Sequence, residues 1–396
     1  MLVGVLLVFT AAMFTYGVYD SDQLPLPVVP QVHLEGVDPE VAEILQQRRA
    51  MVLKAPHKAE LWGEFGMHLH AQAYTNEAMT CYAAASSLES RNPLWPYLRG
   101  IILAQGVNPS AAVPDLRQAA NLSRTDSLSR LKLAEILLAL DRLDEAAAEI
   151  KQVLAANPRD ARGLLIRAQL AVARREYAVA LKSLQQVPDI PFARRQSSTL
   201  LAVVYEGLAD SVAAKLERNR LAGLSPDEPW PDVHINQVEQ RVVGLIGRLR
   251  RAHALMQQQP LQGIQLLRDT VQRYPQSAEA FANLGILLGM IDDYDAAESA
   301  LQKCLEIAPN NAFHWYILGS VRQNHGQFAA AIIAFRKSIE LSSTNPQVYL
   351  ALGECLQQTG NRDDAAAAFQ QARAIEPRME NAKLWIQRNR SRGGEE

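Results

Sequence analysis

Apolar residues recur along most of this chain at helical spacing, in pairs of short stretches separated by breaks. Three consecutive segments near the C-terminus align without gaps and start 34 residues apart, at Ala278, Ala312 and Pro346. In each segment the apolar positions lie on one face of a helix before the break and on one face of a second helix after it. The pattern therefore predicts an all-α chain built from a repeated pair of helices.

Particular residue types recur at fixed positions of these segments. Position 4 is aromatic, Leu-Gly follows at positions 7 and 8, alanine at position 20 and a large apolar residue at position 24, as in Leu284-Gly285, Ala297 and Leu301. The small residues let two helices approach closely, and a proline such as Pro309 ends the second helix. The combination resembles the tetratricopeptide repeat (TPR), which implies a right-handed solenoid of helix-turn-helix units.

The same period extends through the first half of the chain, with more substitutions. Repeat starts 34 residues apart are found at Ala59, Pro93, Ser127, Ala161 and Arg195. Continuing this spacing predicts a start at position 229. The next segment that fits begins at Gly244, and 244 − 229 = 15 residues. We therefore expect about nine repeats in two blocks, five and then four, with an insertion between them.

The repeats and their flanks predict six regions. They are a hydrophobic segment at 1–20, a proline-rich linker at 21–37, a capping helix with the first block at 38–224, an insertion at 225–243, the second block at 244–379, and a polar capping helix with a tail at 380–396. Solenoids need such terminal caps because their end repeats would otherwise expose an apolar face.

The insertion contains the sequence DEPWPDVHINQV at 227–238. Trp230 stands between two prolines, which favours an extended backbone, and Asp232 suits a helix N-terminus. Apolar residues alternate by three and four positions over 238–256, which predicts one continuous helix. We interpret Trp230, Asp232 and His234 as a joint between the blocks, made of a loop and an N-terminal extension of a repeat helix. A metal site is disfavoured because zinc needs three or four ligands and no partner cluster is visible.

The layout also resembles bacterial exported TPR proteins in which a Trp-Pro-Asp segment separates two blocks. This chain has Val233 where such proteins have proline. The resemblance implies an adaptor that holds other proteins by surface complementarity, without covalent chemistry.

By the same resemblance, positions 2, 5, 6, 9, 12 and 13 of each repeat line a concave groove. In repeats two to five these positions are unusually apolar for a face open to water, and large apolar patches usually contact another molecule. The predicted partner-binding residues are Leu94, Tyr97, Leu98, Ile101, Leu128, Leu131, Leu138, Leu165, Ile166, Val172, Leu200 and Val203. A clamp for a terminal carboxylate, which uses Lys and Asn in some TPR proteins, is not matched by Ser320 and Glu354.

We expect the groove to bind an apolar helix or extended segment of a protein partner. Two alternatives stay open at this point. The chain's own residues 25–32, or the loop around Trp230, could fill the groove, or the curvature of the solenoid could bury these positions without any occupant.

Residues 2–19 are uncharged and mostly apolar, about the minimum length for a membrane-spanning helix. The first Lys or Arg after them is Arg48, so the positive-inside rule favours export of the body of the chain. We expect an uncleaved anchor in a bacterial inner membrane with the repeats on the periplasmic side. Secretion after signal cleavage and a cytoplasmic location are the alternatives, and the lack of an AxA-type site and of a basic n-region disfavours cleavage.

Composition and motifs exclude several classes of function. The 40 basic and 42 acidic residues are well mixed and only 6% of residues are aromatic, which gives no support to a nucleic-acid surface. Cys81, Cys304 and Cys355 have no paired spacing, so a zinc ribbon or thioredoxin motif is excluded. The chain has no GxSxG, P-loop or HExxH motif in a plausible context. We expect no enzymatic activity, no cofactor and no small-molecule substrate.

Together these observations predict a membrane-tethered, non-catalytic scaffold for protein–protein interaction. One alternative is an accessory subunit of an envelope assembly machine, for cytochrome maturation, pili or secretion. A second is a purely structural protein whose groove is self-filled, and a third is an enzyme hidden in a degenerate repeat.

Overall fold

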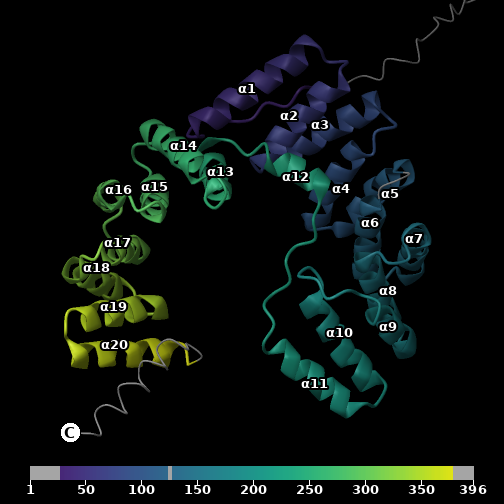
Figure 1. Cartoon of the computed structure of the whole chain (residues 1–396). Coiled ribbons are helices and arrows are strands. Elements are labelled where there is room, and N and C mark those ends of the chain that lie inside the picture. Colours follow the sequence, from purple (N-terminus) through teal and green to yellow (C-terminus); the bar gives the residue numbers. More distant parts are fainter. Residues whose placement is uncertain (1–26, 124–126, 378–396) are drawn as a thin grey trace, which may run out of the picture. The chain divides into compact units, whose positions relative to one another are not determined.

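The computed structural model describes residues 27–123 and 127–377 of the chain (Figure 1). Within these ranges the chain forms α-helices and one short 3₁₀ helix, η1 (Pro109–Ala112), and no strand. The all-α repeat architecture predicted from the hydrophobic pattern is confirmed. The helices form nine successive hairpins in the described part of the chain, and each hairpin begins within one residue of its predicted start.

The hairpins group into two compact units. Among the described residues, unit 1 contains 27–37 and Val41–Val242, and unit 2 contains Asp38–Glu40 and 243–377. The hairpins of unit 1 are α2 (Ala59–Ala71) with α3 (Thr75–Leu88), α4 (Leu94–Gln105) with α5 (Val113–Leu122), α6 (Leu128–Ala139) with α7 (Leu143–Ala156), α8 (Ala161–Ala173) with α9 (Tyr177–Leu184), and α10 (Arg194–Gly207) with α11 (Ser211–Leu221). Those of unit 2 are α13 (Gly244–Leu255) with α14 (Pro260–Arg273), α15 (Ala278–Met290) with α16 (Tyr294–Ile307), α17 (Ala312–Asn324) with α18 (Phe328–Leu341), and α19 (Pro346–Gln358) with α20 (Arg362–Ile375).

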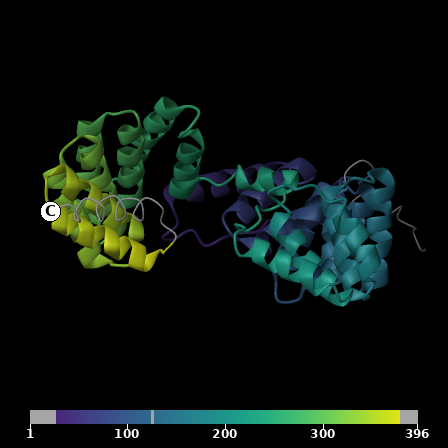
Figure 2. The same ribbon diagram turned by 60° about the horizontal axis from the view of Figure 1, so that its bottom comes forward.

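Within each unit the second helix of one hairpin packs against the first helix of the next, so the hairpins stack in chain order. In unit 2 this stack runs from green to yellow in Figures 1 and 2. The two helices of a hairpin lie close together because position 8 is small and position 24 is large. A Cβ added to Gly319 would lie 2.5 Å from Cε1 of Phe335, whose side chain is fully buried. The repeat signature is therefore a packing requirement of each hairpin.

Helix α1 (Pro39–Lys54) precedes the first hairpin, as the predicted capping helix does. The described residues of the proline-rich segment lie against α1 and α3. Val29 is buried there, and the Nε of Arg49 donates a hydrogen bond of 2.9 Å to the carbonyl of Pro30. Because α3 is the second helix of its hairpin, these residues do not fill the inner groove. That alternative for residues 25–32 is wrong for the part of the segment that the structure describes.

The continuous helix predicted over 238–256 is also wrong. A separate short helix, α12 (Val233–Glu239), ends at Glu239 with Gln240 as its C-cap, and α13 starts at Gly244. Between them Val243 is fully extended, with φ −116° and ψ −175°, and Gly244 has φ +74°. A positive φ is adopted most readily by glycine, and it interrupts a right-handed helix. The apolar spacing alone could not reveal this break.

No described helix combines the length and the apolar character needed to cross a membrane. The predicted anchor or signal segment at 1–20 lies outside the described residues, as does the predicted capping helix and tail at 380–396.

Candidate functional site in the inner groove of unit 1

The predicted groove residues lie on α4, α6, α8 and α10, the first helices of four successive hairpins. Most of them are not open to water. The buried ones are Tyr97, Leu98, Ile101, Leu128, Leu131, Leu165 and Ile166, the half-buried ones are Leu94, Leu138, Val172 and Leu200, and Val203 is 40% exposed. The expectation of an open apolar face in unit 1 is therefore wrong. The role of these residues in binding a partner stays a prediction.

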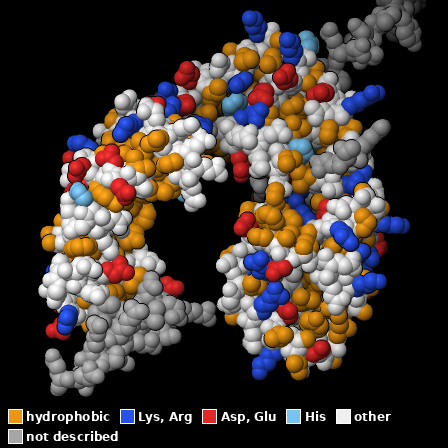
Figure 3. All heavy atoms as spheres, viewed as in Figure 1, with side chains coloured by type: hydrophobic (Ala, Val, Ile, Leu, Met, Phe, Trp, Pro, Cys, Tyr) orange, Lys and Arg blue, Asp and Glu red, His pale blue; other side chains and the backbone are white. Residues whose placement is uncertain are grey.

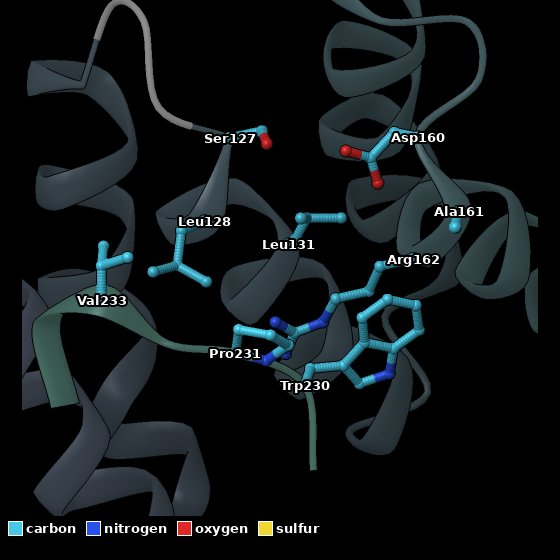
Figure 4. Close-up of a pocket in the computed structure, with 9 residues that line it drawn as sticks. All are labelled: Ser127, Leu128, Leu131, Asp160, Ala161, Arg162, Trp230, Pro231 and Val233. Atoms are coloured by element: carbon cyan, nitrogen blue, oxygen red, sulfur yellow. The ribbon is translucent and has the colours of Figure 1, made fainter. Parts of the chain in front are cut away.

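Residues 225–241, here called the strap, lie against this inner surface. Trp230, Pro231 and Val233 of the strap line a pocket together with Leu128 and Leu131 of α6 and with the first residues of α8 (Figure 4). The loop around Trp230 thus occupies part of the predicted groove, as one of the two alternatives anticipated.

Trp230 is the central apolar contact of the strap. Its ring centroid lies 5.7 Å from that of Phe192, and the Arg162 guanidinium lies 5.8 Å above it. Trp230 also packs against the apolar cluster around Leu165 and Ala168. The guanidinium of Arg162 is itself held by Glu135, to which its Nε donates a hydrogen bond of 2.6 Å. Arg162 can therefore present a fixed cationic face to the indole ring.

Asp232 links the strap to the second hairpin and also begins α12. The Tyr97 hydroxyl donates a hydrogen bond of 2.5 Å to one carboxylate oxygen, and the other accepts the backbone N–H groups of His234 and Ile235 at 3.0 Å. The predicted helix-starting role of Asp232 is confirmed. Burial and the hydrogen bond to Asp232 raise the pKa of Tyr97, so the phenol keeps the proton that it donates. The His234 ring packs edge-on to Tyr97 with centroids 5.0 Å apart.

At its N-terminal end the strap holds the start of α10. The two carboxylate oxygens of Asp227 accept the backbone N–H groups of Arg195 and Gln196 at 2.6 and 2.7 Å. These N–H groups belong to the first turn of a helix, where they lack partners within the helix and the dipole favours negative charge. The backbone N–H of Glu228 donates to the carbonyl of Pro191 at 3.0 Å. Asp227 therefore acts as a cap for a helix more than thirty residues before it.

At its C-terminal end the strap is held by an ion pair with α2. Nε of Arg241 donates a hydrogen bond of 3.0 Å to one carboxylate oxygen of Glu64, and a second guanidinium nitrogen reaches the other oxygen at 2.5 Å. This two-point geometry is the strong form of an ion pair between Arg and a carboxylate. Burial alone would raise the pKa of Glu64, but the hydrogen bond and charge of Arg241 outweigh it and lower that pKa. Val238, between this pair and Asp232, is buried.

Two cavities flank the Trp230 side chain. One, of about 250 Å³, lies between the strap and Leu128 and Leu131, and the other, of about 350 Å³, is lined in part by Leu165 and Ile166. Both cavities open to the surface, and Trp230 is half-buried. The Trp230 side chain therefore lies at the surface of the groove and is not enclosed in a core.

Sequence reasoning missed the partners of the strap, although it selected the strap residues. Asp232 and Tyr97 are 135 positions apart, and Arg241 and Glu64 are 177 apart. Glu64, Arg162 and Asp227 received no role from their local patterns. The available signal was the apolar and aromatic character of the groove positions, which shows that something covers them but does not show what.

Replacing Asp232 by Ala is expected to lower the free energy of unfolding of unit 1 by about 2 kcal/mol. The loss combines a helix N-cap, worth about 1 kcal/mol, with the acceptor of the Tyr97 hydroxyl. Hydrogen exchange of unit 1 peptides at increasing urea measures it. The matched control is Asp210→Ala, which removes an N-cap from α11 but no second side-chain partner. Equal losses in the two variants would show that the Tyr97 contact contributes nothing.

The surface and the described side chains give no sign of another kind of site. On the face shown in Figure 3, Lys and Arg side chains are interspersed with Asp and Glu over the described residues. No group of three or more His, Cys, Asp or Glu side chains converges in a metal-binding arrangement among the residues that the structure describes. Cys81, Cys304 and Cys355 are buried and unpaired, and burial raises the pKa of each thiol.

Comparison with known proteins supports the repeat assignment. One family model, described as tetratricopeptide repeat, matches residues 103–170 and 324–385, and a second with the same description matches 278–311. No curated protein matches this chain. Proteins of this repeat family are generally non-catalytic scaffolds.

Solved structures similar to this chain include other repeat proteins. The crystal structure of MamA protein is 20% identical and covers 54% of this chain and 90% of its own, with a TM-score of 0.29. YrrB, "a TPR protein with an unusual peptide-binding site", is 14% identical and covers 69% of this chain and 97% of its own, with a TM-score of 0.27. PilW, a "widely conserved type IV pilus biogenesis factor", is 16% identical and covers 67% of this chain and 100% of its own, with a TM-score of 0.33. The family models, together with the helical hairpins at a 34-residue period, identify tetratricopeptide repeats in both halves of this chain.

Proposed function

We propose that this protein is a non-catalytic scaffold that holds an extended segment of a protein partner on the inner face of unit 2. One comparison carries the proposal. Position 2 of the eighth repeat is Phe313, whose side chain is 55% exposed. At the same position in the third and fourth repeats, Leu128 and Arg162 are only 8% and 5% exposed and line the pocket beneath the strap. Phe313 is therefore more accessible to a partner than the residues at the equivalent position of the third and fourth repeats.

The side chains around Phe313 suit an extended peptide. Phe313 and Tyr316 lie on one face of α17 with ring centroids 6.2 Å apart, and Met290 of α15 is 51% exposed. Gln323 of α17 donates a hydrogen bond of 2.9 Å to the exposed carboxylate of Glu354 on α19. Aromatic and Met side chains supply apolar contact area, and a side-chain amide such as that of Gln323 can pair with a peptide backbone. The carboxylate favours a partner with a basic residue over one with a terminal carboxylate.

Replacing Phe313 by Glu is expected to weaken partner binding by roughly 30-fold, because loss of a central aromatic anchor typically costs about 2 kcal/mol. The measurement is in-cell photo-crosslinking from position 316, which identifies the partner, followed by titration of the purified partner. The control is Ile333→Glu on α18, the second helix of the same hairpin, where the apolar side chain is 67% exposed. Equal weakening by both variants, or by neither, contradicts the proposed face.

We propose further that residues 2–19 tether the scaffold to a bacterial membrane, with the repeats outside the cytoplasm. The support is the uncharged, apolar segment and the absence of Lys and Arg between it and Arg48. Alkaline phosphatase fused after residue 60 is active if the body is exported and inactive if it is cytoplasmic. Fractionation of the same fusion distinguishes a retained anchor from a cleaved signal.

A further inference from the structure

We propose that the strap is a resident ligand of unit 1: it keeps the inner groove closed to other chains, and the groove recognises the strap's Trp-Pro-Asp sequence as it would a separate peptide. The proposal concerns unit 1 alone and does not depend on the partner proposed for unit 2.

The contacts of the strap are those of a bound peptide. Its extended part, 225–231, is held by side-chain anchors and by one backbone hydrogen bond from Glu228 to Pro191. Pro229 and Pro231 have no N–H group, so an extended course leaves fewer donors without partners. Prolines also restrict the free segment to extended conformations, which lowers the entropy cost of docking.

The anchors reach four of the five hairpins of unit 1. Asp227 holds the start of α10 in the fifth, Trp230 stacks on Arg162 in the fourth, Asp232 accepts from Tyr97 in the second, and Arg241 pairs with Glu64 in the first. The strap therefore runs back along the groove from the last hairpin to the first. Leu128 and Leu131 of the third hairpin face its middle, as Figure 4 shows.

The anchors are specific, but the fit between them is loose. Charged hydrogen bonds at Asp227, Asp232 and Arg241 fix the register, whereas cavities of about 250 and 350 Å³ lie on the two sides of Trp230. A segment that is held at separate points and bordered by clefts open to solvent can leave without unpacking a core. This combination distinguishes a displaceable ligand from an integral element such as α6 or α8.

The test uses a fluorescent synthetic peptide of residues 225–241 added to the full chain. The strap in cis competes at an effective concentration of the order of mM, so the peptide should bind the unmodified chain weakly. The variant Trp230→Ala/Asp232→Ala loosens two anchors and should bind the peptide roughly 100-fold more tightly in fluorescence anisotropy, because the groove is then open for most of the time. A peptide that itself carries Trp230→Ala is the control and should not bind.

A milder variant keeps the test valid if the double variant unfolds. Asp232→Asn preserves a good helix cap but removes the charge that Tyr97 contacts, and it should give intermediate peptide binding. In the loosened chain, Leu131→Glu should abolish capture, which places the peptide in the groove.

Two outcomes overturn the proposal. One is equal affinity of the peptide for the unmodified and loosened chains, which would mean that the strap does not close the groove. The other is no binding to either folded variant, which would mean that the strap is an integral part of unit 1. Neither outcome affects the face proposed for unit 2, whose partner binding is measured separately.

Discussion

Lowering the pH from 6.5 to 4 is expected to reduce the free energy of unfolding of unit 1 by about 3 kcal/mol through His68 alone. His68 of α2 is only 5% exposed. Burial, and next the charge of Arg48, lower its pKa from 6.5 to about 4. Between these two pH values the His68 imidazole is protonated in the unfolded chain but stays mostly neutral in the folded state. Stability is full above the unfolded pKa and falls as the pH drops through the interval to the folded pKa.

The measurement is urea unfolding across this pH range, followed by tryptophan fluorescence with Trp315 and Trp385 replaced by Phe so that only unit 1 reports. His68→Gln should remove about 3 kcal/mol of the pH dependence, whereas His57→Gln, at an exposed position, should leave it unchanged. A His68→Gln profile parallel to that of the unmodified chain would contradict the assignment.

Glu64 acts in a more acidic window than His68. Its pKa is lowered below 4.5, because the pairing with Arg241 outweighs the effect of burial. Its contribution is therefore present above 4.5 and is lost as the pH falls through the folded pKa. This window overlaps the lower end of the His68 window, and the charges of the two groups interact, so the Glu64 contribution is read from the pH profile of the His68→Gln variant.

Replacing Gly319 by Val is expected to destabilise unit 2 by about 3 kcal/mol. The new Cβ would lie 2.5 Å from Cε1 and 2.6 Å from Cδ1 of Phe335. Phe335 is fully buried and cannot move aside without disturbing the hairpin of α17 and α18. Overpacking of this kind typically costs about 1–3 kcal/mol. The β-branched side chain of Val is stiff at χ1, so we expect this variant to lie at the upper end of that range. Urea unfolding followed by the fluorescence of Trp315 on α17 measures the loss.

Gly326→Ala in the turn of the same hairpin separates steric from backbone effects. Gly326 has φ +79°, and a Cβ there would meet no atom within 4 Å. The expected cost is about 1 kcal/mol, which comes from the unfavourable backbone conformation alone. If the two variants lose equal stability, the close approach at Gly319 is not what position 8 requires.

The repeat architecture could be read from the sequence because its determinants are local. The positions that define a hairpin, such as Gly285 and Leu301, lie within one 34-residue segment and contact each other within it. The pattern that predicts a helical hairpin is therefore present within each repeat, and its recurrence in nine repeats strengthens the prediction. The start of α12 at Asp232 was predictable for the same reason, since an N-cap acts on the N–H groups of the next few residues.

The break between α12 and α13 and the course of the strap depended on the tertiary structure. Apolar spacing at 238–256 predicted one continuous helix, whereas the structure has a break before Gly244. Trp230 and Asp232 could be recognised as anchors, but their partners Arg162 and Tyr97 come from other repeats. The stacking of the hairpins is what brings these distant residues into one groove. The sequence by itself determined the repeats, their number and their boundaries, because those depend on contacts within a hairpin. Only the tertiary structure decided that unit 1 covers its own apolar face, because that choice depends on contacts between hairpins far apart in the chain.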